Sequence, residues 1–264
     1  SHIPSLVADD FKRYFPENPK DEYEKARSMK RKFYLHLGDT NTGKTYNAIE
    51  RLKQSEKGVY LAPLRILALE NFERLNREGV PCNLITGEEE IYTEGASHVS
   101  STIEKLDIDK YYDVAVIDEI QMIGNSQRGQ AWTRAVLGIQ SPEVHVCGAA
   151  NSKELLLRII EDCNDEVEVI NYTRDTPLKI INKVFELKHA ERGDALVVFS
   201  KKRVLEIAKL FRERGRRTSV IYGDLPPEVR RMQYDAFLSG ESEILVTTDA
   251  IGMGVNLPIK RIIF

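Results

Sequence analysis

Short apolar runs alternate with amphipathic stretches of helical length along most of this 264-residue chain, and this alternation constrains the fold more than any other feature. The first series of apolar runs covers residues 33–37, 59–62, 83–86, 114–117, 144–147 and 167–170. Helical patterns such as Arg65–Arg77 and 152–162 lie between most of them. Strands that alternate with helices predict a mostly parallel sheet covered by helices on both faces.

A second series of the same kind follows residues 171–177, a polar, turn-rich stretch that we interpret as a linker. It consists of predicted strands at 195–199, 219–221, 243–247 and 261–264 and predicted helices at 201–214 and 226–238. Residues 1–32 predict a short helix, a break at two prolines and a solvated helix. The fold class is therefore α/β, with an N-terminal helical segment at 1–32, a first domain at 33–175 and a second, partial domain at 176–264.

Composition excludes several classes of protein. Hydrophobic residues make up 42% of the chain and charged residues 30%, an ordinary globular balance. No apolar run approaches the roughly 18 residues of a membrane span, so we expect no membrane partner. The net charge of −3 excludes a uniformly basic surface but not a local basic groove. Cys82, Cys147 and Cys163 lie far apart, which excludes a metal finger or a disulfide framework and favours a reducing compartment.

A glycine-containing loop follows the first predicted strand and precedes a helical pattern, which is the context that a GxxxxGKT phosphate loop requires. In such a loop, backbone N–H groups and the N-terminus of the helix face the phosphates. The lysine can reach the β and γ phosphates, and the threonine hydroxyl can ligate Mg²⁺. The predicted nucleotide site consists of Gly38, Asp39, Thr40, Asn41, Thr42, Gly43, Lys44 and Thr45.

Two adjacent acids, Asp118 and Glu119, end the apolar run at 114–117. An enzyme with a phosphate loop places its Mg²⁺ ligand and its water-activating base at the end of such a strand. Asp118 would hold the metal through its water shell, and Glu119 would polarise the attacking water. Adjacent acids are also common at the N-terminus of a helix, where they complement its dipole. The presence of the phosphate loop is what favours a catalytic role for Asp118 and Glu119 over this alternative. The rival acidic cluster, Glu88 to Glu90, lacks a buried strand and predicts a solvated loop.

These motifs resemble those of superfamily 2 DExH-type helicases, and in particular the ATP-dependent RNA helicases of the mitochondrial degradosome and their bacterial homologues. Residues 38–45 and the box Asp-Glu-Ile-Gln at 118–121 resemble the two Walker motifs in the correct order. The resemblance covers about residues 33 to 264. It extends to the segments 62–65, 86–88, 101–104, 197–200, 222–227 and 245–258, the last reading LVTTDAIGMGVNLP.

The resemblance implies two tandem RecA-like domains that use ATP and Mg²⁺ and close around the nucleotide. It adds Gln121 to the catalytic set of Lys44, Asp118 and Glu119, and it adds Gly254 and Asn256 of the second domain to the ATP contacts. The implied nucleic-acid contacts are Pro63, Arg65, Thr86, Gly87, Thr102, Ser200 and Thr248. For each of these polar contacts taken alone, a helix cap or a turn is the competing interpretation.

The leading functional hypothesis is an ATP-dependent RNA helicase. A DNA helicase or translocase is the first alternative, because discrimination depends on contacts to the 2′-OH that no motif reveals. A nucleotide-dependent RNA-binding module without turnover is the second alternative. The resemblance also implies an exoribonuclease as partner, with a location in the cytoplasm of a bacterium or in the mitochondrial matrix of a eukaryote.

Two departures from the family pattern affect these expectations. The third motif, usually Ser-Ala-Thr, reads Gly-Ala-Ala at 148–150, so its hydroxyl contacts cannot be carried over. The arginine-bearing sixth motif is not found in these 264 residues, and we expect the chain by itself to bind ATP but to hydrolyse it poorly. Outside the motifs, we expect the side chains of His36, His145 and Trp132 to be buried in the core. For the histidines the alternative is a ligand role, and for Trp132 it is a base-stacking platform.

Overall fold

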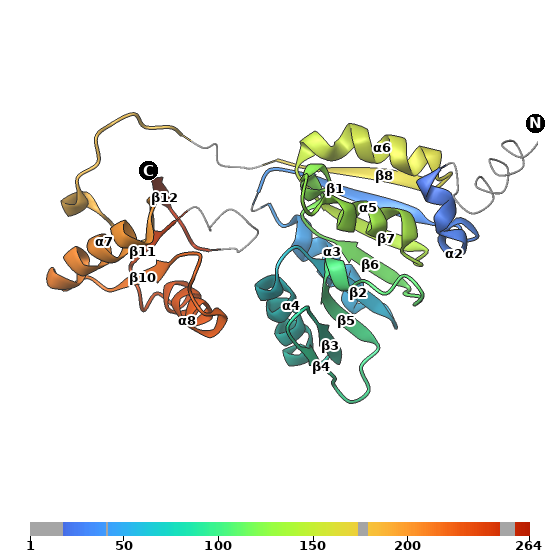
Figure 1. Ribbon diagram of the computed structural model, residues 1–264, viewed down its shortest axis with the longest axis horizontal. Coiled ribbons are helices and arrows are strands. Elements are labelled where there is room, and N and C mark those ends of the chain that lie inside the picture. The colour runs from blue at the N-terminus through green and yellow to red at the C-terminus, as the bar shows by residue number, and fades with distance from the viewer. Residues whose placement is uncertain (1–17, 41, 174–178, 249–256) are drawn as a thin grey trace, which may run out of the picture. The chain divides into compact units, whose positions relative to one another are not determined.

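The computed structural model describes residues 18–40, 42–173, 179–248 and 257–264. The chain divides into two compact units, unit 1 at Ser1–Asp175 and unit 2 at Thr176–Phe264, each built around its own sheet (Figure 1). Within the described residues, no helix is long and apolar enough to cross a membrane.

Unit 1 contains an eight-stranded sheet in the order β4-β3-β5-β2-β6-β7-β1-β8. Neighbouring strands pair in parallel, except that β4 is antiparallel to β3. Parallel pairing brings the carboxyl ends of the strands to one edge, where the loops that follow them can meet. The strands are β1 Lys32–Gly38, β2 Gly58–Ala62, β3 Cys82–Ile85, β4 Glu90–Ile91, β5 His98–Thr102, β6 Val114–Ile117, β7 Glu143–Gly148 and β8 Glu166–Tyr172.

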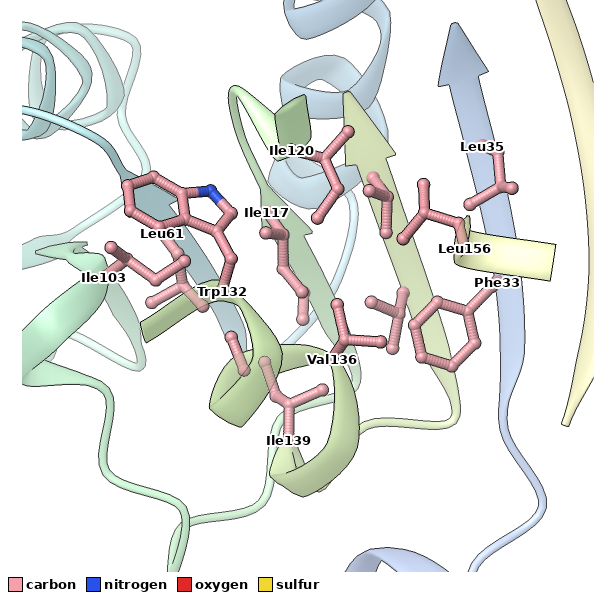
Figure 2. Packing of buried hydrophobic residues seen from close by; sticks show 14 of the residues in the cluster. Phe33, Leu35, Leu61, Ile103, Ile117, Ile120, Trp132, Val136, Ile139 and Leu156 are labelled. Atoms are coloured by element: carbon pink, nitrogen blue, oxygen red, sulfur yellow. The ribbon is translucent and has the colours of Figure 1, made fainter. Parts of the chain in front are cut away.

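Helices cover both faces of this sheet. Alternate residues of β1, Phe33, Leu35 and Leu37, join a core cluster with side chains from α5 (Gly129–Gly138) and α6 (Lys153–Asp162) (Figure 2). The helices α3 (Lys44–Lys53) and α4 (Arg65–Arg77) pack on the other face. The remaining helical segments are short: η1 Pro19–Glu22, α2 Glu24–Arg27, η2 Ile103–Lys105, η3 Ile120–Gly124 and η4 Ala150–Ser152.

Unit 2 contains a four-stranded parallel sheet in the order β10-β11-β9-β12. The edge strand β12 is fixed to β9 by an ion pair, because Arg261 Nη2 lies 2.6 Å from the buried carboxylate of Asp194. The strands are β9 Asp194–Val197, β10 Thr218–Ile221, β11 Ile244–Thr247 and β12 Arg261–Ile263, and the helical elements are η5 Leu187–His189, α7 Lys201–Glu213 and α8 Pro227–Leu238.

The predicted fold class, α/β with two mostly parallel sheets, is confirmed. The bounds predicted for Arg65–Arg77 and Val114–Ile117 are those observed, and the other predicted strands differ from the observed ones by one or two residues at an end. The predicted linker begins too early, since β8 continues to Tyr172. Residues 1–17 lie outside the described part, and the solvated helix expected near residue 32 is limited to Glu24–Arg27, where Ala26 is buried.

Candidate functional site

The loop at 39–43 joins β1 to α3 at the carboxyl edge of the unit 1 sheet. Gly38 has φ +148°, and a Cβ there would lie 1.9 Å from the carbonyl oxygen of Tyr172, so only glycine allows β1 to approach β8 at this point. Gly43 has φ +84° and open space around it, so its requirement is conformational. Glycine is therefore required at position 38 by the close approach of Tyr172 and at position 43 by the left-handed backbone conformation. Asn41 lies outside the described residues.

The side chain of Lys44 folds back over this loop. Its ammonium group donates hydrogen bonds to the carbonyl oxygens of Gly38, at 3.2 Å, and of Asp39. Burial lowers the pKa of Lys44. The Thr42 hydroxyl donates to the Asp39 carbonyl oxygen at 2.8 Å, which stabilises the turn. The ammonium group is thus held against the carbonyl oxygens at the start of the loop.

The acidic box is joined directly to the phosphate loop. The Thr45 hydroxyl donates to Asp118 Oδ1 at 3.0 Å, and the Tyr60 hydroxyl donates to Asp118 Oδ2 at 2.8 Å. Asp118 is 5% exposed, and burial raises its pKa while these hydrogen bonds lower it. The Trp132 indole donates to the backbone carbonyl oxygen of Asp118 at 2.9 Å. Both carboxylate oxygens and the carbonyl oxygen of Asp118 therefore have fixed partners.

Glu119 adopts a left-handed backbone conformation with φ +51°, which is uncommon for a residue other than glycine and is found at functional sites. Burial and the Asp118 carboxylate raise its pKa. The Gln121 amide donates to Glu119 Oε2, and Gln121 Oε1 accepts a hydrogen bond from the backbone N–H of Ala149 at 3.1 Å. Gln121 thereby connects the acidic box to the segment that replaces Ser-Ala-Thr.

The glycine that begins this segment has a steric explanation. A Cβ at Gly148 would lie 2.5 Å from Gln121 Oε1 and 2.7 Å from the Ile120 side chain. A serine there would collide with the glutamine that orients Glu119. This segment contacts Gln121 through the backbone N–H of Ala149, and Gly148 provides the space for that contact.

The residues that the resemblance assigns to nucleic acid in unit 1 follow three neighbouring strands. Pro63 and Arg65 follow β2, Thr102 ends β5, and Thr86 and Gly87 follow β3. Arg65 makes ion pairs with Glu89, at 2.6 Å, and with Glu88, at 3.1 Å. The Glu88 to Glu90 cluster is therefore not simply a solvated loop.

Thr86 and Ser200 occupy the turn and cap positions that sequence reasoning gave as the competing interpretation. The Thr86 side chain is buried, and its hydroxyl oxygen accepts from Glu89 N at 3.1 Å while donating to Glu89 O at 3.0 Å. Gly87, beside it, is exposed. In unit 2, Ser200 caps α7 by accepting from Arg203 N at 3.2 Å, and Thr248 follows β11. Gly254 and Asn256 lie outside the described residues.

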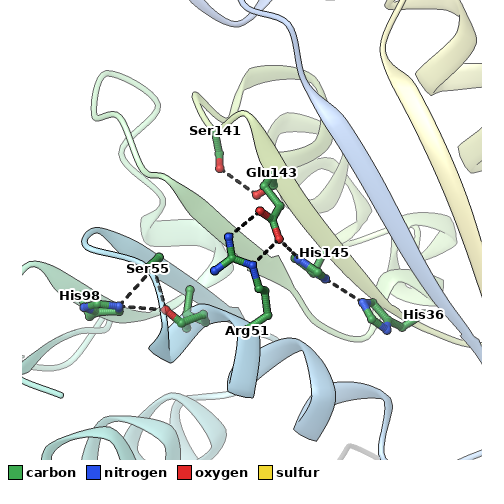
Figure 3. Close-up of polar contacts among 8 residues, drawn as sticks. His36, Arg51, Ser55, His98, Ser141, Glu143 and His145 are labelled. Carbon is green, nitrogen blue, oxygen red and sulfur yellow. Dashed lines mark hydrogen bonds and ion pairs between the residues drawn. The ribbon is translucent and has the colours of Figure 1, made fainter. Parts of the chain in front are cut away.

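A chain of polar contacts runs from the buried histidines of β1 and β7 to α3 (Figure 3). His36 Nε2 lies 2.8 Å from His145 Nδ1, and His145 Nε2 lies 2.7 Å from Glu143 Oε1. Glu143 in turn accepts from Arg51 on α3 at 2.8 Å. At the other end, His36 Nδ1 lies 2.8 Å from the Tyr172 hydroxyl. Both histidines are buried core residues with satisfied ring nitrogens, as predicted.

Comparison with known proteins identifies the family. Residues 19–172 match the DEXQ-box helicase domain of Suv3, and 118–121 supply the Asp-Glu-Ile-Gln box in the geometry described above. The chain belongs to the Suv3-type DEXQ-box helicases. Residues 176–264 match the helicase conserved C-terminal domain. The two matches together cover nearly all of the described residues of this Suv3-type chain.

Relatives of this Suv3-type chain are considerably longer. A mitochondrial ATP-dependent RNA helicase SUPV3L1 from Danio rerio is 47% identical over 253 residues, which cover 93% of this chain and 33% of that protein. The mitochondrial DExH-box ATP-dependent RNA helicase DExH18 from Arabidopsis thaliana is 43% identical over 244 residues, or 90% of this chain and 31% of that protein. The chain therefore spans about a third of the length of these relatives.

Similarity to solved structures supports the fold. The structure of S. cerevisiae Dbp5 bound to Gle1 and IP6 has a TM-score of 0.65 and 16% sequence identity, and the alignment covers 98% of this chain and 76% of that one. At this level of identity the match establishes the RecA-like architecture of the Suv3-type chain and nothing about its ligands.

Sequence reasoning missed three residues that the structure of this Suv3-type chain brings to the site. Tyr60 contacts Asp118 from the neighbouring strand, Trp132 was assigned only to the core, and Arg128 contacts Pro63 and Glu104. A tyrosine in the middle of an apolar strand was a signal for the first. The other two contacts join positions that no local pattern connects.

Proposed function

We propose that the chain is the ATP-driven motor of an RNA helicase, which couples ATP hydrolysis to translocation on RNA and to unwinding of RNA. The observation that carries this proposal is the 3.0 Å hydrogen bond between Thr45 and Asp118, because it joins the phosphate loop to the acidic box at one edge of the sheet. The names of the 43–47% identical relatives, ATP-dependent RNA helicases, supply the substrate class.

The phosphate loop would hold the triphosphate through its backbone N–H groups and the Lys44 ammonium. Thr45 and Asp118 would hold Mg²⁺, which when bound offsets negative charge on the phosphates. The donor set fits this ion, because the buried Asp118 carboxylate receives hydrogen bonds only from neutral groups. Among the described residues, no group of three or more His, Cys, Asp or Glu side chains could hold a metal. That agrees with an ion held by few protein ligands together with phosphates and water.

Glu119 would act as the general base that takes a proton from the attacking water. Its raised pKa makes the carboxylate a stronger base than an ordinary glutamate, and Gln121 fixes one of its oxygens. Gly254 and Asn256 of unit 2 would complete the nucleotide site, as the family resemblance implies.

RNA would bind along the carboxyl ends of β2, β3 and β5 through Pro63, Arg65, Thr86, Gly87 and Thr102, with Ser200 and Thr248 contributed by unit 2. Contacts of this kind go to phosphates and sugars, which fits a motor that must move independently of sequence. A net charge of −3 is compatible with RNA binding of this kind, because backbone amides and a few cationic side chains would make the contacts to the RNA backbone.

The proposal is tested by measuring ATP hydrolysis by the native-length protein with no nucleic acid, with single-stranded RNA and with DNA of the same sequence. We expect RNA to stimulate hydrolysis more than DNA does, and Glu119→Gln to lower the stimulated rate by about a hundredfold or more. Stronger stimulation by DNA would favour a DNA translocase. Nucleotide-dependent RNA binding without any hydrolysis would favour the module without turnover.

The location and the partner are further parts of this proposal. The relatives named above are mitochondrial, so we propose the mitochondrial matrix for a eukaryotic source. The cytoplasm, for a bacterial source, rests on the family resemblance alone. An exoribonuclease partner, implied by the family resemblance, is tested by co-purification from the native source.

A further inference from the structure

Arg128 connects the ends of two strands that carry different motifs. Its guanidinium Nη2 donates to the backbone carbonyl oxygen of Pro63 at 2.6 Å, and its Nε donates to Glu104 Oε1 at 2.8 Å. Pro63 directly follows β2, and Glu104 lies two residues beyond the end of β5. One planar group therefore bridges the two strand ends to which the RNA contacts Arg65 and Thr102 are attached.

The same guanidinium lies over the ring of Trp132, which in turn contacts the acidic box. Its central carbon is 5.3 Å from the centre of the Trp132 ring, and the Trp132 indole donates to the carbonyl oxygen of Asp118. Trp132 is fully buried, and it is one turn of helix after Arg128. A continuous set of contacts thus runs from Pro63 and Glu104 through Arg128 and Trp132 to Asp118.

The local backbone is built to hold Arg128 in this position. The Asn125 side chain accepts hydrogen bonds from Gln127 N, at 3.0 Å, and from Arg128 N, at 2.9 Å. A Cβ at Gly129 would lie 2.4 Å from the Ile123 carbonyl oxygen, so glycine is required where α5 begins against η3. The start of α5 is therefore packed tightly against the segment that follows the acidic box.

We propose that Arg128 is a positioning residue that couples RNA binding at the ends of β2 and β5 to the nucleotide site at the end of β6. RNA that orders the Pro63 turn changes the contacts of Arg128, and Trp132 transmits this change to the backbone of Asp118. This inference rests on the proposed function and extends it to a residue outside the motifs. A physical coupling of this kind must appear as a free energy that links the two binding events.

The test measures the affinity of the chain for a fluorescent single-stranded RNA, with and without Mg²⁺ and the non-hydrolysable analogue AMP-PNP. The ratio of the two dissociation constants is the coupling factor, and no hydrolysis is needed to obtain it. We expect Arg128→Ala to lower this factor by about tenfold, within the usual range of such couplings. Arg128→Lys should be intermediate, because one ammonium group cannot reproduce the planar fork that bonds both Pro63 and Glu104.

Arg134→Ala is the matched control. Arg134 lies on α5, the helix that Arg128 directly precedes, and donates to the Leu106 carbonyl oxygen at 2.8 Å, so its removal costs the same charge and a similar hydrogen bond. We expect this variant to keep the parental coupling factor. A merely structural role for Arg128 would instead change the melting temperature and both RNA affinities equally, leaving their ratio at the parental value.

A double-mutant cycle with Trp132→Phe tests the path itself. Phenylalanine keeps a ring beneath Arg128 but removes the donor to Asp118. If both residues act in one path, the double variant should lose little more coupling than either single variant. Three results would each overturn this inference alone. They are fully additive losses of coupling in the cycle, an unchanged coupling factor in Arg128→Ala, and an equal loss of coupling in Arg134→Ala. A parent chain with no coupling between AMP-PNP and RNA would overturn the proposed function as well.

Discussion

The ATP-binding and RNA-binding regions proposed for unit 1 lie along the same edge of one sheet, but their side chains are held in opposite ways. Asp118 is buried, and its oxygens are fixed by hydrogen bonds from Thr45, Tyr60 and Trp132. At the ends of β2 and β3, Arg65 is partly exposed and is held by the carboxylates of Glu88 and Glu89.

This difference follows from what each region must do. Buried, preorganised groups stabilise a developing charge without reorganising, which suits the chemical step. Partly exposed ion pairs are worth only about 0–1 kcal/mol, so a passing phosphate can replace them repeatedly. A rigid region and an exchangeable region therefore coexist within one sheet edge, and the variants below test the contrast from the largest expected effect to the smallest.

The largest effect should come from Lys44→Ala, which removes the charge that faces the phosphates. We expect ATP hydrolysis by the native-length protein to fall by about a thousandfold, the scale of losing a preorganised electrostatic group, with weaker nucleotide binding. Lys53→Ala is the control, because Lys53 lies at the far end of the same helix and pairs with Glu50 and Glu78. Hydrolysis by Lys44→Ala at the parental rate would refute the assignment of the phosphate loop.

Glu119→Gln should follow, since it keeps the shape of the side chain and removes the base. We expect turnover to drop by about a hundredfold or more. RNA affinity in the presence of ATP should match or exceed that of the parent, because the ATP-bound state is trapped. Turnover and RNA binding are measured on the same preparation. Persistent turnover would mean that another group orients the water.

Gly148→Ser should give a smaller loss in the rigid region, although it restores the usual first residue of the third motif. The new side chain would collide with Gln121 and displace Glu119, so we expect kcat to fall by about tenfold while KM for ATP changes little. Gly124→Ser is the control, because a Cβ at Gly124 meets no atom within 4 Å. A Gly148→Ser protein with parental kcat would show that the Gln121 contact is dispensable.

Glu89→Gln should have the smallest effect and the opposite sign. Weakening the ion pair frees Arg65 for phosphate, so RNA affinity should rise by about twofold to fivefold. Glu90→Gln changes the net charge equally, but the Glu90 carboxylate accepts from the Tyr92 hydroxyl at 2.8 Å. RNA titrations at two salt concentrations measure both variants. An equal gain in RNA affinity in the two variants would show that the effect comes from net charge and not from the ion pair with Arg65.

Sequence reasoning identified the local features of this molecule and missed the distant ones. The phosphate loop and the acidic box were found because each is set by a short pattern after an apolar strand. Strand β5 was missed because its sequence, HVSST, is polar, and the buried Ser100 hydroxyl is satisfied only by donating to Ala68 on α4. Arg128 could not have been found, because its contact with Pro63 joins residues that are 65 positions apart.

The two buried histidines of β1 and β7 have a consequence for proton binding. Burial and the proximity of His145 lower the pKa of His36 to about 4, and burial also lowers the pKa of His145. Between about pH 6.5 and pH 4 the unfolded chain therefore takes up protons that the folded chain refuses, so acidification favours unfolding. For His36 alone, the lowered pKa corresponds to a loss of roughly 3 kcal/mol in the free energy of unfolding once the pH is below both the folded and the unfolded pKa. Acidification from about pH 6.5 toward pH 4 should therefore lower the free energy of unfolding of unit 1, and an acid titration followed by circular dichroism measures this loss.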